Sequence, residues 1–533
     1  MSNLSIKIFK NTFWQVLSRI IQAFVGLISI KLISSFLPLN VYGQYTTLFE
    51  IIGFFAIIAD FGLYTIGVQE MSKEKHSESF VLSHILSLRL ILITILLGSS
   101  NIIIPLIPKY AGTLVDKGIG LVSLTTAFVL INGTLTSVLQ YKMKMHLAAI
   151  AQIFGKIINI SLIAFIILIL KPVNIETSFN LLIQSAVVAN LLMLLLTFIL
   201  IKKETNLKYA FDLKYAKELI KTAFPYGIAL ILMTFYFKID IILIQYLKGN
   251  EQAGIYGVSL KLMEILSVIS VFFMNSTLPS MTKKFQQGKK DFNELIQKVF
   301  TVLHSLAAPI MVGGIILAFP IIFAITSPQF LSGYHCSNNT QIVYQTKEVA
   351  ADKCSKIKEH PSFKMENQKD SYFYRNGSDQ AFKIILIGLY FSFLNTIFAF
   401  SLVSINKNTN LMKINFLGFL LNIFLNLLLI PKYGFIAAAI TTAVCEFSVF
   451  ILTYKNFQKF TKFKINSNKY IKTIIAAIAM GVIVNFSQII SYNWMQNFNL
   501  IILIPIGFVV YFYMLNKLKV LSLKDIKKIR NEN

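Results

Sequence analysis

Long apolar segments recur along almost the whole chain and are separated by mostly short polar ones. A helix needs about 20 mostly apolar residues to cross a bilayer, and fourteen segments meet this requirement: 12–37, 42–69, 80–107, 118–141, 147–170, 178–201, 219–247, 252–281, 295–327, 382–405, 411–430, 434–454, 470–490 and 497–516. The segment 295–327 contains Pro309 and Pro320, so we expect it to be kinked or broken. The pattern predicts an all-α polytopic membrane protein.

The composition excludes an ordinary soluble protein. Of the 533 residues, 55% are hydrophobic and 14% are charged, whereas soluble domains have about 25% charged residues. Three cysteines are too few for a disulfide framework. The short basic N-terminus is followed by an apolar run without a small-residue cleavage site, so we expect an uncleaved first span.

The net charge of +26 is explained by topology. With the N-terminus inside, the cytoplasmic segments carry 31 Lys and Arg residues and the six short outer loops carry 5. This alternation follows the positive-inside rule. We therefore expect both termini on the cytoplasmic side of the cell membrane and attraction to anionic lipid, and we expect no nucleic-acid binding.

The chain contains a weak internal repeat. The turn Leu37-Pro38-Leu39-Asn40 with Gly43-Gln44-Tyr45 has a counterpart six spans later in Leu247-Lys248-Gly249-Asn250 with Gly254-Ile255-Tyr256. Transporters built from parallel repeats hold substrate between their halves. We expect two six-helix lobes and two added helices, arranged as follows: N-lobe 1–201, cytoplasmic linker 202–218, C-lobe 219–454 interrupted by an extracytoplasmic insert at 328–381, cytoplasmic loop 455–469, helices 470–516 and a basic cytoplasmic tail 517–533.

The sequence offers no catalytic constellation. It has no Gly-x-x-x-x-Gly-Lys-Ser/Thr phosphate loop, no Gly-x-Ser-x-Gly, no Asp pair spaced i, i+2, and no His pair spaced i, i+4. We therefore expect no catalytic residue, no metal site and no cofactor, and we expect transport rather than enzymatic activity.

Charged residues within the spans are the candidate functional residues, because a charge at depth normally faces a cavity or a partner. Cations suit an anionic ligand such as a pyrophosphate joined to sugars. The candidate substrate-binding residues are Arg19, Arg89, Lys156, Lys238, Lys261, Asn422 and Asn426, and the candidate ion- or proton-coupling residues are Asp60, Asp240 and Glu264. For some of these residues a structural role remains an alternative to substrate or ion binding. Lys261 and Glu264, spaced i, i+3, could neutralise each other, and the asparagines could form interhelical hydrogen bonds.

The insert 334–381 is polar and has few aliphatic residues, so we expect no robust core. Cys336 and Cys354 are a possible disulfide, since the topology places both on the oxidising side; the alternative is a floppy loop with two free thiols. Cys445 is in a span. We expect that a short linker can replace 335–380 without loss of transport, the alternative being a docking surface for an assembly partner.

Short motifs in a fixed order resemble those of Wzx-type oligosaccharide flippases. They are Leu37-Pro38, Tyr42-Gly43-Gln44-Tyr45, Asp60-Phe61-Gly62-Leu63, Gln69-Glu70, Pro225-Tyr226-Gly227, Lys238-Ile239-Asp240, Gly254-Ile255-Tyr256, Ile430-Pro431-Lys432-Tyr433-Gly434 and Ala437-Ala438-Ala439. The resemblance covers residues 8 to 490 apart from the insert. Many members of that family have Arg where this chain has Ser35, and Arg-Glu where it has Gln69-Glu70.

The resemblance implies a V-shaped, two-lobed exporter of the multidrug/oligosaccharidyl-lipid/polysaccharide (MOP) superfamily. It implies alternating access that flips a polyprenyl-pyrophosphate-linked oligosaccharide for surface polysaccharide such as O-antigen, with a polysaccharide polymerase or assembly proteins as possible partners. The alternatives are an ion-coupled multidrug-type exporter, a peptidoglycan-precursor flippase, and a membrane polysaccharide polymerase or ligase.

Overall fold

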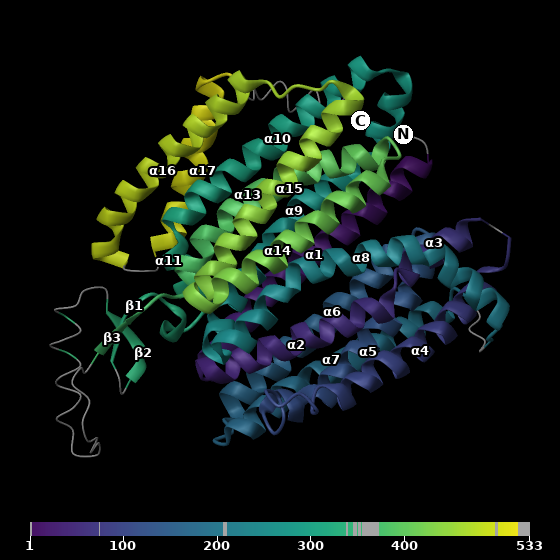
Figure 1. Cartoon of the computed structure of the whole chain (residues 1–533), viewed down its shortest axis with the longest axis horizontal. Helices are drawn as coiled ribbons and strands as arrows, with labels where there is room; N and C mark the ends of the chain where they lie inside the picture. The colour runs from purple at the N-terminus through teal and green to yellow at the C-terminus, as the bar shows by residue number, and fades with distance from the viewer. Residues whose placement is uncertain are drawn as a thin grey trace. The chain divides into compact units, whose positions relative to one another are not determined.

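The computed structural model is almost entirely helical (Figure 1). It describes residues 3–73, 75–205, 210–336, 339–344, 349, 353, 372–495 and 499–520. Within these residues, thirteen helices are long and apolar enough to cross a membrane, or fourteen if the bent pair Leu230–Tyr236 and Lys238–Lys248 is one span. This confirms the predicted fold class. The chain divides into two compact units, Met1–Gly254 and Ile255–Asn533.

The first unit contains the first eight α-helices and the start of the ninth. Its helices are α1 (Asn3–Phe36), α2 (Leu39–Asp60), α3 (Leu63–Ser72), α4 (Glu78–Ile103), α5 (Leu114–Tyr141), α6 (Met145–Phe165) with a π-helical end at Ile166–Leu170, α7 (Ile175–Lys202), α8 (Leu213–Lys248) and the beginning of α9 (Asn250–Gln287). Side-chain caps start several of them: Ser77 accepts from the Phe80 N–H at 3.3 Å, and Asn174 accepts from the Glu176 N–H at 2.8 Å.

The predicted span 42–69 is not one continuous helix. The backbone has positive φ at Phe61 (44°) and Gly62 (73°), and this left-handed pair separates α2 from α3. A Cβ at Gly227 would lie 3.0 Å from the Phe61 ring and carbonyl. The glycine therefore allows α8 to pack closely against Phe61 at the break. The sequence interpretation missed this break because the apolar pattern continues through it.

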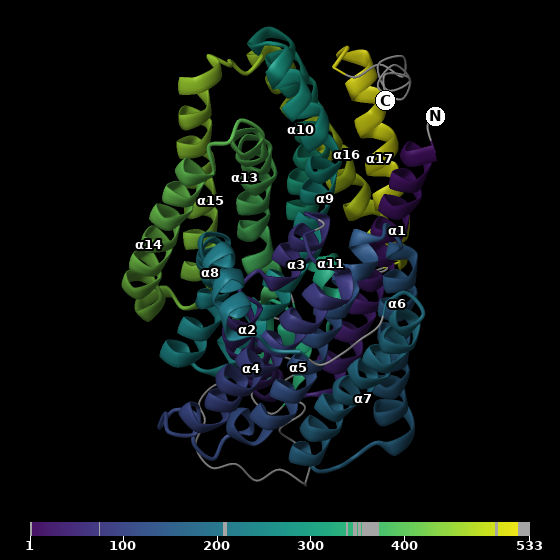
Figure 2. The ribbon, with the colours of Figure 1, turned by 90° about the vertical axis from the view of Figure 1, so that its right-hand side faces the viewer.

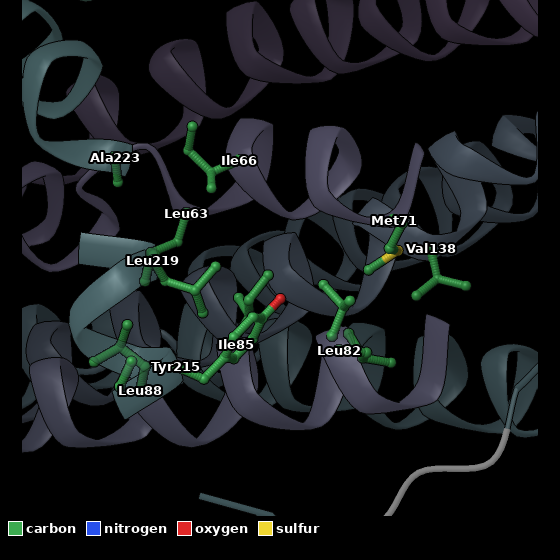
Figure 3. Packing of buried hydrophobic residues seen from close by; sticks show 12 residues of the cluster. Leu63, Ile66, Met71, Leu82, Ile85, Leu88, Val138, Tyr215, Leu219 and Ala223 are labelled. Carbon is green, nitrogen blue, oxygen red and sulfur yellow. The ribbon is translucent and has the colours of Figure 1, made fainter. Parts of the chain in front are cut away.

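Next to the break, a hydrophobic cluster joins four helices (Figure 3). Its buried members on α3, α4, α5 and α8 are Leu63, Ile66, Met71, Val81, Leu82, Ile85, Leu88, Val138, Tyr215, Ala216, Leu219 and Ala223. Two of the α8 residues, Tyr215 and Ala216, lie before the predicted start of that span at 219. Burial of this apolar surface fixes the first turns of α8 against α3 and α4.

The second unit contains the rest of α9 and α10 (Lys289–Ile316), α11 (Ala318–Ile325), a 3-10 turn at Pro328–Phe330, strands β1 (Gly333–Cys336), β2 (Asn339–Tyr344) and β3 (Tyr372–Arg375), and helices α13 (Ser378–Ser404), α14 (Asn408–Tyr433), α15 (Phe435–Thr461), α16 (Ser467–Met495) and α17 (Leu500–Lys517). The predicted break in 295–327 occurs at Leu317, between α10 and α11, while Pro309 lies inside α10.

The two units share one packing pattern. In the first, α5 packs on α4 and α7, and α6 packs on α7; in the second, α13 packs on α10 and α15, and α14 packs on α15. These helices are six spans apart in the order of the chain, as the sequence repeat predicts. The helices α16 and α17 lie side by side (Figure 1), and α16 packs on α10. In the structure α8 packs on α2, α3 and α4, so it belongs to the first compact unit, whereas the predicted C-lobe begins with this span.

Candidate functional site

The fully buried Arg89 is paired with Asp60 at the α2–α3 break. Its Nη1 donates to Asp60 Oδ1 at 2.6 Å and to the Ala59 carbonyl at 3.3 Å, and its Nε donates to Thr134 Oγ1 at 3.1 Å. Asp60 Oδ2 accepts from the Gly62 N–H at 3.3 Å. Within the described residues, Arg89 Nη2 has no hydrogen-bond partner. The pair therefore holds α4 and α5 against the break in α2.

A second ion pair joins α2 to α8. Lys238 Nζ bonds Glu50 Oε2, and the side chains are 24% and 11% exposed. A Cβ at Gly53 would lie 3.4–3.5 Å from the Lys238 Cδ, Cε and Nζ atoms, so the lysine stem lies directly over this glycine. The sequence interpretation included Lys238 as a candidate but did not name Glu50 as its partner. The apolar residues between Glu50 and Gly53 do not indicate a contact with a lysine on another helix.

The remaining first-unit candidates are spread over several helices. Arg19 on α1 and Lys156 on α6 are exposed, whereas Asp240 on α8 is buried at 2% exposure. One turn from Arg19, Gln22 donates to Ser18 at 2.9 Å and to Gln152 on α6 at 3.0 Å. This polar cluster joins α1 to α6.

In the second unit, Lys261 and Glu264 form an exposed ion pair of 2.6 Å on α9. On α14, Asn426 Nδ2 donates to Asn422 Oδ1 at 3.1 Å, and both asparagines are buried. The first contact fits the mutual neutralisation raised for Lys261 and Glu264. The second joins two residues of one helix, α14, so it is not itself the interhelical hydrogen bond raised for the asparagines.

A buried polar network at the start of α16 was not predicted. His304 on α10 contacts the Tyr390 hydroxyl through Nδ1 and the Tyr470 carbonyl through Nε2, both at 3.2 Å. Tyr390 also donates to the Tyr470 hydroxyl at 2.9 Å, and Tyr511 on α17 donates to the Ser305 carbonyl at 2.8 Å. The network attaches the last two helices to α10 and α13, and scattered single residues in the sequence could not reveal it.

The insert contains a three-stranded antiparallel sheet in the order β2-β1-β3 (Figure 1). Tyr334 is opposite Tyr344 on one side and Tyr374 on the other. Cys336 is disulfide-bonded and Cys445 is a buried free thiol, while Cys354 lies outside the described residues. Partial burial, with Asp379 and Tyr334 nearby, raises the pKa of Tyr374.

The predicted end of the insert at 381 is wrong, because α13 begins at Ser378. Asp379 is buried and accepts from the Ser332 N–H at 2.8 Å and from its hydroxyl at 2.5 Å. Ser378 donates to the Ile255 carbonyl at 2.7 Å. A short linker in place of 335–380 would remove both side chains and these hydrogen bonds.

The described residues contain no group of three or more His, Cys, Asp or Glu side chains that could hold a metal ion. The first unit brings two candidates, Arg89 and Asp60, into direct contact and pairs a third, Lys238, with Glu50. Charged groups enclosed by helices can bind an anion or change partners as the helices move.

The sequence comparison decides the family. The sequence model of polysaccharide biosynthesis proteins matches residues 8–285, which is more than half of the chain. The chain belongs to this family. A search of curated proteins finds no significant match.

Solved structures of similar fold are membrane transporters. The lipid II flippase MurJ, in an inward closed conformation, has a TM-score of 0.70 at 16% sequence identity. The match covers 95% of this chain and 98% of the MurJ chain. A multidrug-resistance MATE transporter of the MOP superfamily, in its inward-facing conformation, has a TM-score of 0.61 at 12% sequence identity. This match covers 85% of this chain and 98% of the transporter chain. At these identities the similarity shows the fold alone, and this family member shares the multi-pass helical fold of these two proteins.

Proposed function

We propose that this polysaccharide biosynthesis protein flips a polyprenyl-pyrophosphate-linked oligosaccharide repeat unit across the cytoplasmic membrane by alternating access. Its product would be used to build a surface polysaccharide such as O-antigen or capsule. The family membership over residues 8–285 carries this proposal. The fold supports it, since a protein named as a lipid II flippase matches almost the whole chain.

The substrate would be held by charge. Arg and Lys bind phosphate through charge-assisted hydrogen bonds, so we assign the pyrophosphate to the intramembrane cations Arg19, Arg89, Lys156, Lys238 and Lys261, with Asn422 and Asn426 contacting the sugar. Asp60, Asp240 and Glu264 are the proposed coupling sites. An inside-negative potential also favours outward movement of an anion, at about 2.3 kcal/mol per charge per 100 mV.

The proposed topology has both termini in the cytoplasm, because the basic residues gather in that set of loops. The N-lobe 1–201 and the C-lobe 219–454 would alternate access, and 470–516 would be added helices. Partners would be the lipid-linked oligosaccharide, anionic lipid, and a polymerase or assembly protein on the outer side. No cofactor or nucleic acid is required.

The test is to locate lipid-linked repeat units in a strain that lacks the protein. We expect them to accumulate facing the cytoplasm, and the full chain reconstituted in vesicles should move them across the bilayer. Outward-facing, unpolymerised units would instead indicate a polymerase or ligase and would refute the proposal.

Flipping of a peptidoglycan precursor is the second candidate, favoured by the structural similarity to the lipid II flippase. Depletion would then cause lipid II to accumulate and cells to lyse, while repeat-unit assembly would continue. A multidrug-type exporter, suggested by the MATE similarity, would change drug susceptibility without altering either lipid pool.

A further inference from the structure

The Lys238–Glu50 pair lies deep within the first unit. Glu50 is eleven residues from the start of α2 and Lys238 is ten residues from the end of α8. At 1.5 Å per residue, both lie about 15–17 Å from the helix ends. Those ends meet each other, since Asn250 Nδ2 donates to Asn40 Oδ1 at 2.9 Å. The two charged groups therefore lie at the same depth, far from either end of the helices.

The lysine is the accessible member of the pair. Lys238 is 24% exposed and Glu50 is 11% exposed. An ammonium has three N–H donors, and in the described part of the chain the hydrogen-bond acceptor of Lys238 is the Glu50 carboxylate. Gly53 leaves room for the lysine stem on α2. An anion that approaches this ammonium thus meets a single competing carboxylate.

We propose that Glu50 is a displaceable counter-ion, and that the phosphate-bearing headgroup of the substrate takes its place on Lys238 during binding. This assignment of the headgroup rests on the proposed function. In a medium of low dielectric constant an ammonium without a counter-ion is strongly disfavoured. Glu50 supplies the negative charge when the site is empty, and its return to Lys238 expels the headgroup after transport.

Two other candidate cations, Arg89 and Lys261, fit this role less well. Arg89 is fully buried and holds Asp60, Thr134 and the Ala59 carbonyl, so its displacement would disturb the α2–α3 break. Lys261 is in an exposed pair with a neighbour on its own helix. Lys238 combines exposure with a partner from a different helix, so an exchange of partners there changes the contact between α2 and α8.

Binding of inorganic pyrophosphate to the purified full chain in detergent tests the proposal by calorimetry. E50Q keeps a hydrogen-bond acceptor but removes the competing charge, so we expect affinity to rise about tenfold or more. The double variant E50Q/K238Q should lose this gain. The control E176Q removes an equal charge from the exposed Lys117–Glu176 pair in the same unit, and its affinity should equal that of the wild type.

Two binding results would overturn the proposal: an E50Q affinity no higher than that of E176Q, or a gain that persists in E50Q/K238Q. In reconstituted vesicles, E50Q should flip the lipid-linked oligosaccharide more slowly because the headgroup is retained; an unchanged rate would also contradict it. If the wild type flips no lipid-linked saccharide but pyrophosphate binding follows the expected series, the proposed function fails while the anion site stands.

Discussion

Asp60 offers a direct test of the α2–α3 break, through the variant D60N. Its two carboxylate oxygens serve different partners: Oδ1 accepts from Arg89 and Oδ2 from the Gly62 N–H. An asparagine has one acceptor oxygen, so the variant loses one of these bonds as well as the charge. It leaves the Arg89 guanidinium, fully buried at 0% exposure, without a counter-ion.

The expected loss of unfolding free energy follows from this geometry. Breaking a buried ion pair from one side costs about 3–5 kcal/mol. Asp60 is 23% exposed, and the bonds from Arg89 to Thr134 and Ala59 survive, so we expect a value at the low end, about 3 kcal/mol. R89M leaves the Asp60 carboxylate, which is 23% exposed and keeps its bond from the Gly62 N–H, and should cost less, about 1–2 kcal/mol.

The assay is equilibrium unfolding of the purified chain in mixed micelles with increasing SDS, for the wild type, D60N, R89M and D60N/R89M. The double variant removes both charges, so its loss should be smaller than the sum of the single losses by about 1–2 kcal/mol. The matched control E176Q breaks an exposed pair and should cost less than about 1 kcal/mol. Additive losses, or a D60N loss no greater than that of E176Q, would refute the role given to the pair.

Three further predictions concern transport. Replacing 337–371 with a Gly/Ser linker should leave membrane insertion and flipping intact in a vesicle assay, whereas the same replacement extended through Asp379 should reduce the amount of folded protein. R19A should abolish flipping while the protein stays in the membrane, and R19K should rescue it only partly because bidentate geometry is lost; normal flipping by R19A would make Arg19 dispensable. Collapse of the membrane potential with an ionophore should slow flipping, since two charges gain on the order of 4 kcal/mol from 100 mV; an unchanged rate in depolarised vesicles would exclude the potential as the driving force.

The hydropathy pattern alone predicted the all-α membrane fold and its fourteen candidate spans. This succeeded because a bilayer requires each spanning helix to be apolar over its own length, which is a local property of sequence. The turn around Pro38 and its counterpart six spans later predicted the repeat, and the packing of α5 and α13 reproduces it. Membership of the polysaccharide biosynthesis family agrees with the flippase resemblance.

The sequence failed where the outcome depended on contacts between distant residues. The break at Phe61 and Gly62 depends on Arg89 and on the space left by Gly227, although the apolar pattern continues through it. Likewise, the start of α13 at Ser378 is fixed by Asp379 and its bonds to Ser332, although the segment is polar enough to be interpreted as loop.

The sequence therefore determined which segments enter the membrane, and the tertiary structure decided which intramembrane charges neutralise each other. Hydropathy is summed over neighbours in the chain, whereas the partner of a buried charge is chosen by proximity in space. Glu50 and Lys238 are 188 residues apart in the sequence, and only the packing of α2 on α8 brings them together. In the sequence each is a single charge within an apolar segment, and in the structure they form one ion pair.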